Sequence, residues 1–307
     1  MNIKTLPLSL LLFVSMQIHA QTLPPYVPAD GLIGWWPFSG NAVDSSGTGN
    51  NGTASNTTLT SDRFGNTNAA YSFNGFNSRI EIPEAASLNC TKLSLSAWVF
   101  NRNISKTGQI IYKGSSFASG ETFSLTSVNS YPGYALKIAS ACQPAIGWKG
   151  GRFKQLASQG TWEHLVLTYD GTVSRLYKNG APDTSATLSG LIDICQGGGL
   201  RFGYNHNLYS NSTGDCFDGV IDDIGIWNRA LTQTEVGRLF SANMDCSDVG
   251  NLGVNVCVPQ RSLHVKDVIR LEPRSFSPPN PSKGDIYFDG VTNKLRVYDG
   301  TTWRDCW

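Results

Sequence analysis

The chain has 307 residues, enough for one large β domain and a smaller one, and 24 Lys and Arg against 23 Asp and Glu leave a net charge of +1. It carries no basic run and no acidic tail, which excludes the charge patterns typical of nucleic-acid-binding proteins. The 32 glycines, with many Asn, Ser and Thr residues, indicate frequent turns rather than helices.

The chain begins with a segment typical of a secretory signal peptide, residues 1–20. An early lysine precedes an apolar run from Leu6 to Ile18, and the small Ala20 ends the segment. The apolar run is short for a membrane span, so we expect cleavage after Ala20 and a secreted or surface-exposed protein without a transmembrane segment in the mature chain. Residues 21–30, which contain three prolines, are expected to form an extended lead-in.

Short strand patterns follow, separated by glycine and asparagine. The first, Leu32 to Phe38, is apolar nearly throughout, and a polar loop from Asn41 to Leu59 comes after it. A loop of this length inside a compact domain is usually either functional or mobile. Strands this short and this closely spaced favour a sandwich of antiparallel sheets. Further strands are predicted at Ala70–Phe73, Arg79–Ile82, Leu93–Phe100, Gln109–Tyr112, Thr122–Ser127, Tyr134–Ile138, Trp162–Tyr169 and Leu200–Tyr204.

The most informative stretch is Phe217 to Phe240, which predicts one strand, a turn and one short helix. The strand, Val220 to Trp227, is rich in the β-branched and aromatic residues that suit a half-buried sheet. Its isoleucines change phase across Asp222 and Asp223, so a β-bulge that restores one inward face is expected there.

The helix of this stretch carries its own start signal. Thr232 followed by Glu235 forms a capping box, and Leu231 can pack onto Val236, so the helix is predicted to begin at Gln233. Its apolar residues lie in one stripe, which we expect to close one end of a sandwich.

At these residues the chain resembles a known family. The closing strand and helix, G-x-I-D-D-x-x-I-W-N-R-A-L-x-x-x-E-V, resemble those of laminin G-like jelly-roll domains, in the concanavalin A-like and pentraxin-like group. Two further stretches resemble the same family, Gly31 to Asn51 and Trp162 to Gly180. The resemblance implies an all-β antiparallel sandwich over residues 31–244, in which Leu32–Phe38 pairs with Val220–Trp227.

The composition changes after this domain. Residues 245–283 are predicted to form a linker or stalk with a proline-rich bend, and residues 284–307 a small β-meander with Asp-Gly turns. The sequence PQRSLHV, followed by GDIYFDGVTNKLRVYDGTTW, resembles stalk and tail segments of phage tail-fibre-like and bacterial surface proteins. The meander is too small to bury its apolar side chains, so we expect it to associate between chains. The resemblance implies a homotrimer.

All seven cysteines follow the signal segment and would reach an oxidising compartment, where disulfides are expected. None forms a C-x-x-C pair and no histidine lies at zinc spacing beside one, which argues against a metal cluster. The sequence leaves the pairing open. The pairs we expect are Cys195 with Cys216 and Cys257 with Cys306, and the odd number leaves at least one thiol free or paired between chains.

Three acids are candidates for a calcium site. Asp44 lies in the polar loop, and Asp222 and Asp223 lie at the predicted bulge, where a carboxylate needs a partner. Asp44 and Asp223 sharing one Ca²⁺ would supply hard oxygen ligands. The alternative is that these acids cap turns or accept backbone N–H bonds. Pentraxin-type relatives use further acids in the loop before the closing strand, which Tyr204 to Asn207 lack, so a double-calcium site is not expected.

Aromatic and amide side chains are the candidates for sugar binding. Sugar-binding proteins stack an exposed aromatic ring on a pyranose and use amide and carboxylate groups for its hydroxyls. Trp148 lies in a glycine-rich stretch and either stacks on a sugar or anchors its loop on the sandwich. The other candidates are Tyr131, Tyr134, Tyr204, Asn205 and His206.

No catalytic pattern is recognisable in the sequence. The resembled superfamily includes glycoside hydrolases with carboxylates at alternate positions of one strand, as in E-x-D-x-x-E, and no such run occurs here. We therefore expect a secreted, non-catalytic protein that binds an extracellular polysaccharide or glycoprotein and acts in adhesion. The alternatives are a glycoside hydrolase or lyase, an accessory module of one, and a structural spacer of a surface assembly.

Overall fold

The computed structural model of the chain describes residues 23–114, 121–128, 130–138, 147–194, 198–204, 215–241, 273–278 and 281–306. The chain divides into two compact units, Met1–Asn255 and Val256–Trp307. The predicted signal peptide, and the predicted boundary between residues 244 and 245, lie outside the described residues and stay predictions. Within the described ranges, no helix is long and apolar enough to cross a membrane.

The first unit is built almost wholly of strands, as the sequence predicts. They form an eight-stranded sheet, in the order β13-β12-β11-β6-β15-β4-β3 with β1 also paired to β15, and a seven-stranded sheet, in the order β10-β9-β8-β7-β14-β5-β2. The bounds are β1 (Leu32–Trp36), β2 (Thr53–Ser55), β3 (Thr58–Thr60), β4 (Ala70–Asn74), β5 (Arg79–Ile82), η1 (Ala86–Leu88), β6 (Leu93–Asn101), β7 (Gly108–Gly114), β8 (Glu121–Val128), β9 (Tyr131–Lys137), β10 (Trp148–Arg152), β11 (Trp162–Tyr169), β12 (Val173–Lys178), β13 (Ala181–Thr187), β14 (Leu200–Phe202), β15 (Asp218–Trp227) and α1 (Gln233–Ser241).

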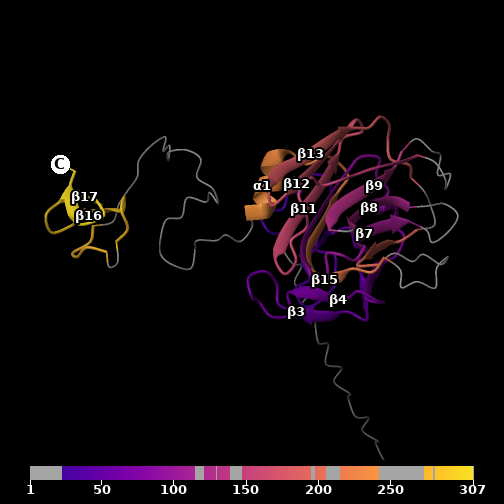
Figure 1. The fold of residues 1–307 in the computed structure, drawn as a ribbon, viewed down its shortest axis with the longest axis horizontal. Coiled ribbons are helices and arrows are strands. Elements are labelled where there is room, and N and C mark those ends of the chain that lie inside the picture. The colour runs from indigo at the N-terminus through magenta and orange to yellow at the C-terminus, as the bar shows by residue number, and fades with distance from the viewer. Residues whose placement is uncertain are drawn as a thin grey trace, which may run out of the picture. The chain divides into compact units, whose positions relative to one another are not determined.

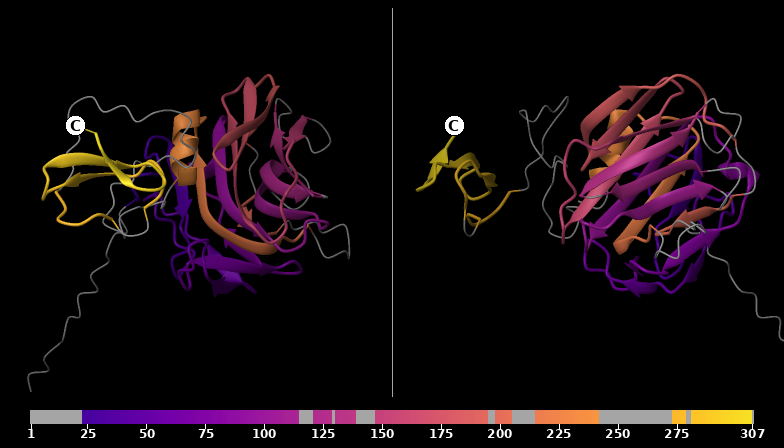
Figure 2. Two further views of the ribbon diagram at one scale, coloured as in Figure 1. Left: turned by 60° about the vertical axis from the view of Figure 1, so that its left-hand side comes forward. Right: turned by 45° about the vertical axis from the view of Figure 1, so that its right-hand side comes forward.

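The two sheets pack face to face, with α1 outside the eight-stranded sheet (Figures 1 and 2). Alternate residues of each strand fill the space between them. On β11, Leu165 and Leu167 face inward, whereas Val166 between them faces outward. Large side chains such as Trp36 and Phe202 are fully buried, their ring centres 4.9 Å apart, and each such side chain contributes about 1.5–3 kcal/mol by leaving water. The expected all-β antiparallel sandwich is confirmed.

The closing strand β15 lies in the middle of the eight-stranded sheet. Its first half pairs with β4 and its second half with β1, where Leu32 opposes Trp227, so the predicted pairing of the first and last strands is confirmed. The register against β6 shifts between Asp222 and Gly225, and Asp223 has a φ of 45°. The predicted bulge is therefore present, and it returns the isoleucines on both sides of it to the core.

The helix α1 begins at Gln233, as predicted. The Thr232 N–H donates to Glu235 Oε2 at 2.8 Å, and the Glu235 N–H donates to Thr232 Oγ1 at 3.2 Å, which completes the capping box. The helix does not close an end of the sandwich, contrary to the prediction. It covers the outer face of the eight-stranded sheet, because outward-facing apolar side chains there need cover. The cluster comprises Val27, Trp35, Val166, Tyr177, Trp227, Leu231, Val236 and Leu239.

The hydropathy pattern of the sequence does not predict four of the strands. The predicted polar loop, Asn41 to Leu59, contains β2 and the start of β3, and the glycine-rich stretch contains β10. The edge strand β13 follows the Asn179-Gly180 turn. Edge strands with mostly exposed, polar residues carry no alternation of apolar side chains, so hydropathy does not reveal them.

The second unit contains a three-stranded antiparallel sheet, which confirms the predicted meander. Its strands are β16 (Ile286–Asp289), β17 (Lys294–Tyr298) and β18 (Trp303–Asp305). The Tyr287 ring packs edge-on against Trp303, with centroids 4.6 Å apart, but Ile286 and Val291 are 54% and 69% exposed. The resemblance of this unit to stalk segments and its trimerisation are not tested by these contacts.

Candidate functional site

One row of side chains crosses the outer face of the seven-stranded sheet. Residues that oppose each other on neighbouring strands point to the same face, so the register defines the row. Large polar side chains lie at the β2 end and small residues at the β10 end. The row is Thr53, Glu81, Arg201, Tyr112, Ser124, Ala135 and Gly150. The middle of the row, at Tyr112 and Ser124, is buried. The residues at its two ends, Thr53 and Gly150, are exposed to solvent.

The large-residue end holds a charged group that we call the Arg-Glu cluster: Arg79, Glu81, Arg201 and Tyr204. Arg79 Nε donates to Glu81 Oε2 at 2.9 Å, and Arg201 Nε lies 3.5 Å from Glu81 Oε1. The Arg79 guanidinium lies 5.9 Å from the centre of the Tyr204 ring. A cavity of about 370 Å³, which Glu84 also lines, adjoins Glu81 and Arg201. Glu81 and Arg201 thus offer a carboxylate and a charged donor at the cavity, while Arg79 and the Tyr204 ring belong to the cluster but do not line the cavity.

Glu81 is held in its ionised form. Partial burial raises the pKa of this carboxyl, but the hydrogen bond from Arg79 and the charges of Arg79 and Arg201 outweigh burial and lower the pKa below its usual value. At neutral pH Glu81 is therefore a hydrogen-bond acceptor. A general acid for glycosidic cleavage has a raised pKa instead.

The other end of the row is bare backbone and a few exposed side chains. A Cβ on Gly150 would lie 2.5 Å from the carbonyl oxygen of Tyr134, so the close approach of β10 to β9 requires glycine there. Tyr131 at the start of β9 is 37% exposed, and Lys149 and Arg152 on β10 are exposed as well. Among the side chains whose exposure the structure describes, this end offers the Tyr131 ring and the cations Lys149 and Arg152 along a sheet edge.

Of the three acids predicted to bind calcium, Asp44 is saturated by hydrogen bonds from its own loop and from β1. Its Oδ1 accepts the N–H groups of Trp35 at 3.0 Å and Ser46 at 2.9 Å. Its Oδ2 accepts the Asn50 N–H at 2.9 Å and the Thr48 hydroxyl at 2.8 Å. Burial raises the pKa of Asp44, but these bonds outweigh it and leave the pKa lowered.

Asp222 and Asp223 are bound by an arginine of the protein. Arg63 Nη1 donates to Asp222 Oδ2 at 2.9 Å and Nη2 to Asp223 Oδ2 at 2.7 Å, and the arginine side chain is only 5% exposed. Its guanidinium lies between the rings of Phe64 and Trp98, 4.4 Å from each centre. The sequence gives no signal for this contact, because Arg63 lies 159 positions before Asp222.

These partners do not fit a calcium ion shared by Asp44 and Asp223. Asp44 uses both of its oxygens, and the Arg63 guanidinium already pairs with Asp223. Among the described residues, no group of three or more His, Cys, Asp or Glu side chains is arranged to hold a metal. For Asp44 the geometry supports the alternative stated from the sequence, a carboxylate that accepts backbone N–H bonds. Calcium binding itself is untested and stays a prediction.

Residues 73–237 match the model of the concanavalin A-like lectin/glucanases superfamily, which is more than half of the chain. The chain belongs to this superfamily. No curated protein matches it.

Solved structures resemble this concanavalin A-like domain at low sequence identity. Domain 4 of AbnA, an extracellular arabinanase from Geobacillus stearothermophilus, in complex with arabinotriose, has 21% identity and a TM-score of 0.53, over 68% of this chain and 97% of that one. The binding domain of Paraclostridial mosquitocidal protein 1 has 19% identity and a TM-score of 0.53, over 69% of this chain and 52% of that one. The ligand-binding domain of botulinum neurotoxin serotype D, in complex with N-acetylneuraminic acid, has 16% identity and a TM-score of 0.52, over 70% of this chain and 52% of that one. The chain spans about half the length of the last two, and at these identities the likeness shows the fold alone.

The concanavalin A-like fold separates the aromatic residues that the sequence proposes for sugar binding. Tyr134 is not available, since it is 6% exposed, lies in the core and shares a 2.6 Å hydrogen bond with Ser174. Tyr131 and Trp148 lie on β9 and β10, whereas Tyr204 follows β14, with β7 and β8 in between. Asn205 and His206 lie outside the described residues.

The cysteines of the concanavalin A-like domain that the structure describes are free thiols. Cys216 is buried and its thiol donates to the Phe76 carbonyl at 2.9 Å, and burial raises the pKa of Cys90 to about 12, which keeps it protonated. Cys306 of the second unit is also free. The expected partners, Cys195 and Cys257, lie outside the described residues, so neither pairing is seen and both stay predictions.

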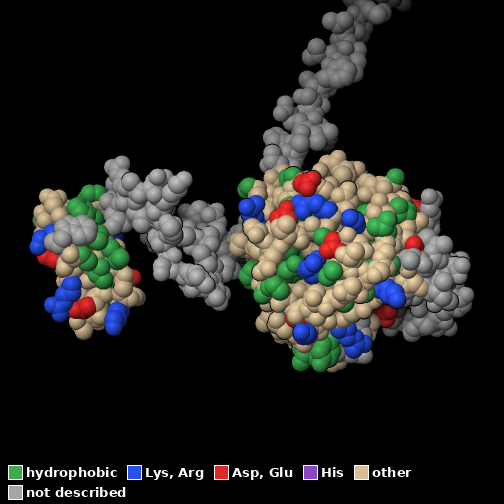
Figure 3. Space-filling view, turned by 90° about the horizontal axis from the view of Figure 1, so that it is seen from above, with side chains coloured by type: hydrophobic (Ala, Val, Ile, Leu, Met, Phe, Trp, Pro, Cys, Tyr) green, Lys and Arg blue, Asp and Glu red, His purple; other side chains and the backbone are tan. Residues whose placement is uncertain are grey.

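The charges on one face of the described residues follow no single sign. On the face seen in Figure 3, Lys and Arg side chains are interspersed with Asp and Glu. This agrees with the net charge of +1 and with the absence of a basic run in the sequence. That face therefore offers no electrostatic argument for a nucleic-acid partner.

Proposed function

We propose that the protein is a secreted, non-catalytic binding protein for an extracellular polysaccharide or glycoprotein glycan, and that it serves adhesion. The observation that carries this proposal is the Arg-Glu cluster, of which Glu81 and Arg201 line a cavity of about 370 Å³. Charged hydrogen-bonding groups next to an aromatic ring are the groups that hold sugar hydroxyls and the apolar face of a sugar ring. Two proteins with this fold, the AbnA domain and the serotype D domain, are described with arabinotriose and N-acetylneuraminic acid bound.

The state of Glu81 favours binding over cleavage. Its carboxylate is ionised and paired with Arg79 and Arg201, so it accepts hydrogen bonds from a ligand and has no proton to give to a leaving group.

A glycan array probed with the full chain, with and without calcium, tests this function. Replacing Arg201 with alanine should weaken binding roughly 10-fold or more, since a hydrogen bond to a charged group is worth about 1.5–3 kcal/mol. Arg238→Ala is the matched control, because this exposed arginine lies on α1. If no glycan binds, or if both variants bind like the original chain, the proposed site is wrong.

Trp148→Ala examines the opposite end of the row. If the indole stacks on a sugar, this variant should bind less tightly without a lower melting temperature, and if it anchors the loop, the melting temperature should fall. Loss of binding in Trp148→Ala together with full binding in Arg201→Ala would move the site to the β10 edge.

A glycoside hydrolase remains the second candidate, since two carboxylates, Glu81 and Glu84, line the same cavity. Release of reducing sugar from a polysaccharide by the full chain, lost in Glu84→Gln, would establish that activity and overturn the non-catalytic proposal. Secretion is tested separately, by N-terminal sequencing of exported protein, which should begin at Gln21.

A further inference from the structure

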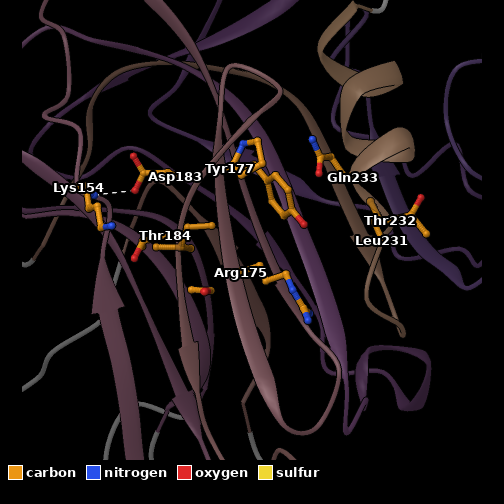
Figure 4. A pocket seen from close by; sticks show the side chains of 11 residues that line it. Lys154, Arg175, Tyr177, Asp183, Thr184, Leu231, Thr232 and Gln233 are labelled. Carbon is orange, nitrogen blue, oxygen red and sulfur yellow. Dashed lines mark hydrogen bonds between the residues drawn. The ribbon is translucent and has the colours of Figure 1, made fainter.

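A second, larger cavity, of about 620 Å³, lies at the β12–β13 hairpin of the eight-stranded sheet. On one side of the hairpin, Arg175 and Tyr177 of β12 project toward the segment Leu231–Gln233 that leads into α1 (Figure 4). Ser185 and Pro182 oppose them on β13. We call this part of the cavity, between the hairpin and the start of α1, the hairpin groove. Its volume lies within the roughly 300–1,000 Å³ typical of small-molecule sites.

Tyr177 presents a hydroxyl that the protein does not use. The residue is 5% exposed, and its ring packs in the outer apolar cluster with Leu231 and Val236. No group in the described part of the chain hydrogen-bonds to its Oη, and the ring carries that oxygen toward the groove (Figure 4). A rigidly held tyrosine with a free hydroxyl is prepared to donate or accept one hydrogen bond at no cost in side-chain entropy.

The other groups of the hairpin groove complement this hydroxyl. Ser185 offers an exposed hydroxyl and Gln233 an exposed amide, while Pro182 and Leu231 supply carbon surface. Neutral donors and acceptors around a small apolar surface match a sugar, which has hydroxyls on its rim and C–H groups on its faces.

The charges within the hairpin groove disfavour an anion. Lys154, which also lines the cavity, lies on the other side of the hairpin beside Asp183, whose Oδ2 accepts the Lys154 N–H at 2.6 Å (Figure 4). Arg175 Nη1 donates to Asp170 at 2.9 Å, which neutralises much of its charge. The first turn of α1 already holds a carboxylate, since Glu235 is bound by Thr232 and Arg229, and these bonds lower the pKa of Glu235 to about 2. A positive helix terminus that carries its own acid has little attraction left for a second negative charge.

We infer that the hairpin groove is a second saccharide-binding site, specific for a neutral sugar unit and separate from the Arg-Glu cluster, which lies on the other sheet. The inference rests on the proposed function, because it assumes that the protein meets glycans. It adds a second point of attachment on the same domain. A polysaccharide long enough to reach both sites would gain avidity without any new contact.

The test uses the full, ¹⁵N-labelled chain and follows amide chemical shifts during titration with arabinotriose, a neutral sugar. Two sets of saturable shifts are expected, one including Gln233 and Ser185 and one including Glu81 and Arg201. Tyr177→Phe removes only the unbonded hydroxyl and should weaken binding at the groove roughly 3- to 10-fold, with no change at the cluster and an unchanged melting temperature.

Tyr71→Phe is the matched control, since Tyr71 is also a buried tyrosine but lies in the core between the sheets, and both sites should bind unchanged in it. Shifts confined to the Arg-Glu cluster would overturn the second site and leave the proposed function standing. Shifts confined to the groove, lost in Tyr177→Phe, would support the second site and refute the first. Groove shifts with N-acetylneuraminic acid but not with arabinotriose would refute the neutral specificity, and no shifts with either sugar would refute both sites.

Discussion

Arg63→Met is the substitution that tests most directly how the closing strand is held. Arg63 donates to Asp222 and Asp223 over 2.9 and 2.7 Å, and all three side chains are at most 11% exposed. Methionine keeps much of the apolar stem between the Phe64 and Trp98 rings, but it leaves two adjacent carboxylates without their cation.

The expected loss is large. Removing one partner of a buried ion pair costs about 3–5 kcal/mol of the free energy of unfolding. The whole free energy of unfolding of a domain is typically about 5–15 kcal/mol. For a domain of this size, where 1 kcal/mol corresponds to about 2–4 °C, the melting temperature at pH 7 should fall by roughly 6–20 °C.

The loss should depend on pH with a definite sign. Burial and the adjacent Asp223 raise the pKa of Asp222 well above its usual value, and burial raises the pKa of Asp223 against the opposing charge of Arg63. A folded state that binds more protons than the unfolded state loses stability as the pH rises. Without Arg63 both pKa values rise further. The loss in free energy of unfolding caused by Arg63→Met should therefore be smallest below about pH 4 and grow toward pH 7.

Urea unfolding of the full chain, followed by tryptophan fluorescence at pH 4.5 and pH 7, measures both effects. Arg238→Met, at an exposed arginine of α1, should change the free energy of unfolding by no more than about 0.5 kcal/mol. Adding Asp222→Asn and Asp223→Asn to Arg63→Met should restore stability, because asparagine tolerates the φ of 45° at position 223. A loss below about 1 kcal/mol at pH 7, or an equal loss at both pH values, would refute the reasoning.

Three further outcomes are expected. Thr232→Ala breaks the capping box and should lower the free energy of unfolding by about 1 kcal/mol in urea titrations, and an unchanged midpoint would contradict this. A calcium chelator should not lower the melting temperature by removing an ion shared by Asp44 and Asp223, since both are already bonded, whereas a drop of several degrees would show that the calcium binding predicted from the sequence occurs. In sedimentation, the full chain should be a trimer and a chain lacking Val256–Trp307 a monomer, and monomers in both cases would exclude assembly through the second unit.

The fold could be predicted where its signals are local or repeated. The change of phase at Asp222 and Asp223 marks the bulge within a single strand, and the capping box that begins at Thr232 marks the start of α1 within four residues. The burial of Tyr134 was also predictable, because Tyr134, Leu136 and Ile138 alternate as core residues do. The alternation places Tyr134 among the core residues and not among the exposed rings that a sugar could reach.

The candidate site could be predicted only in fragments, because tertiary contacts assemble it. Arg79 and Glu81 alternate with inward-facing isoleucines on β5, but their partner Arg201 comes from β14, which no local pattern places beside β5. Arg63 likewise lies far from its partner in the sequence, 159 positions before Asp222. The hydrogen bonds of Asp44 depend on how its loop folds back onto β1. Local sequence identified the acids correctly as groups in need of partners and could not name those partners.

The place of β15 in the sheet also governs how the chain can fold. It is the last strand of the sandwich in the sequence, yet it lies between β6 on one side and β4 and β1 on the other. The first strand, β1, therefore has no partner until almost the entire domain has left the ribosome. Sheets closed by such distant pairings form slowly, because a long loop must be ordered before the contact forms.

Until β15 inserts, β1, β4 and β6 each expose a hydrogen-bonding edge to other chains. A chain that stops before Asp218 is consequently an aggregation-prone fragment rather than a smaller sandwich.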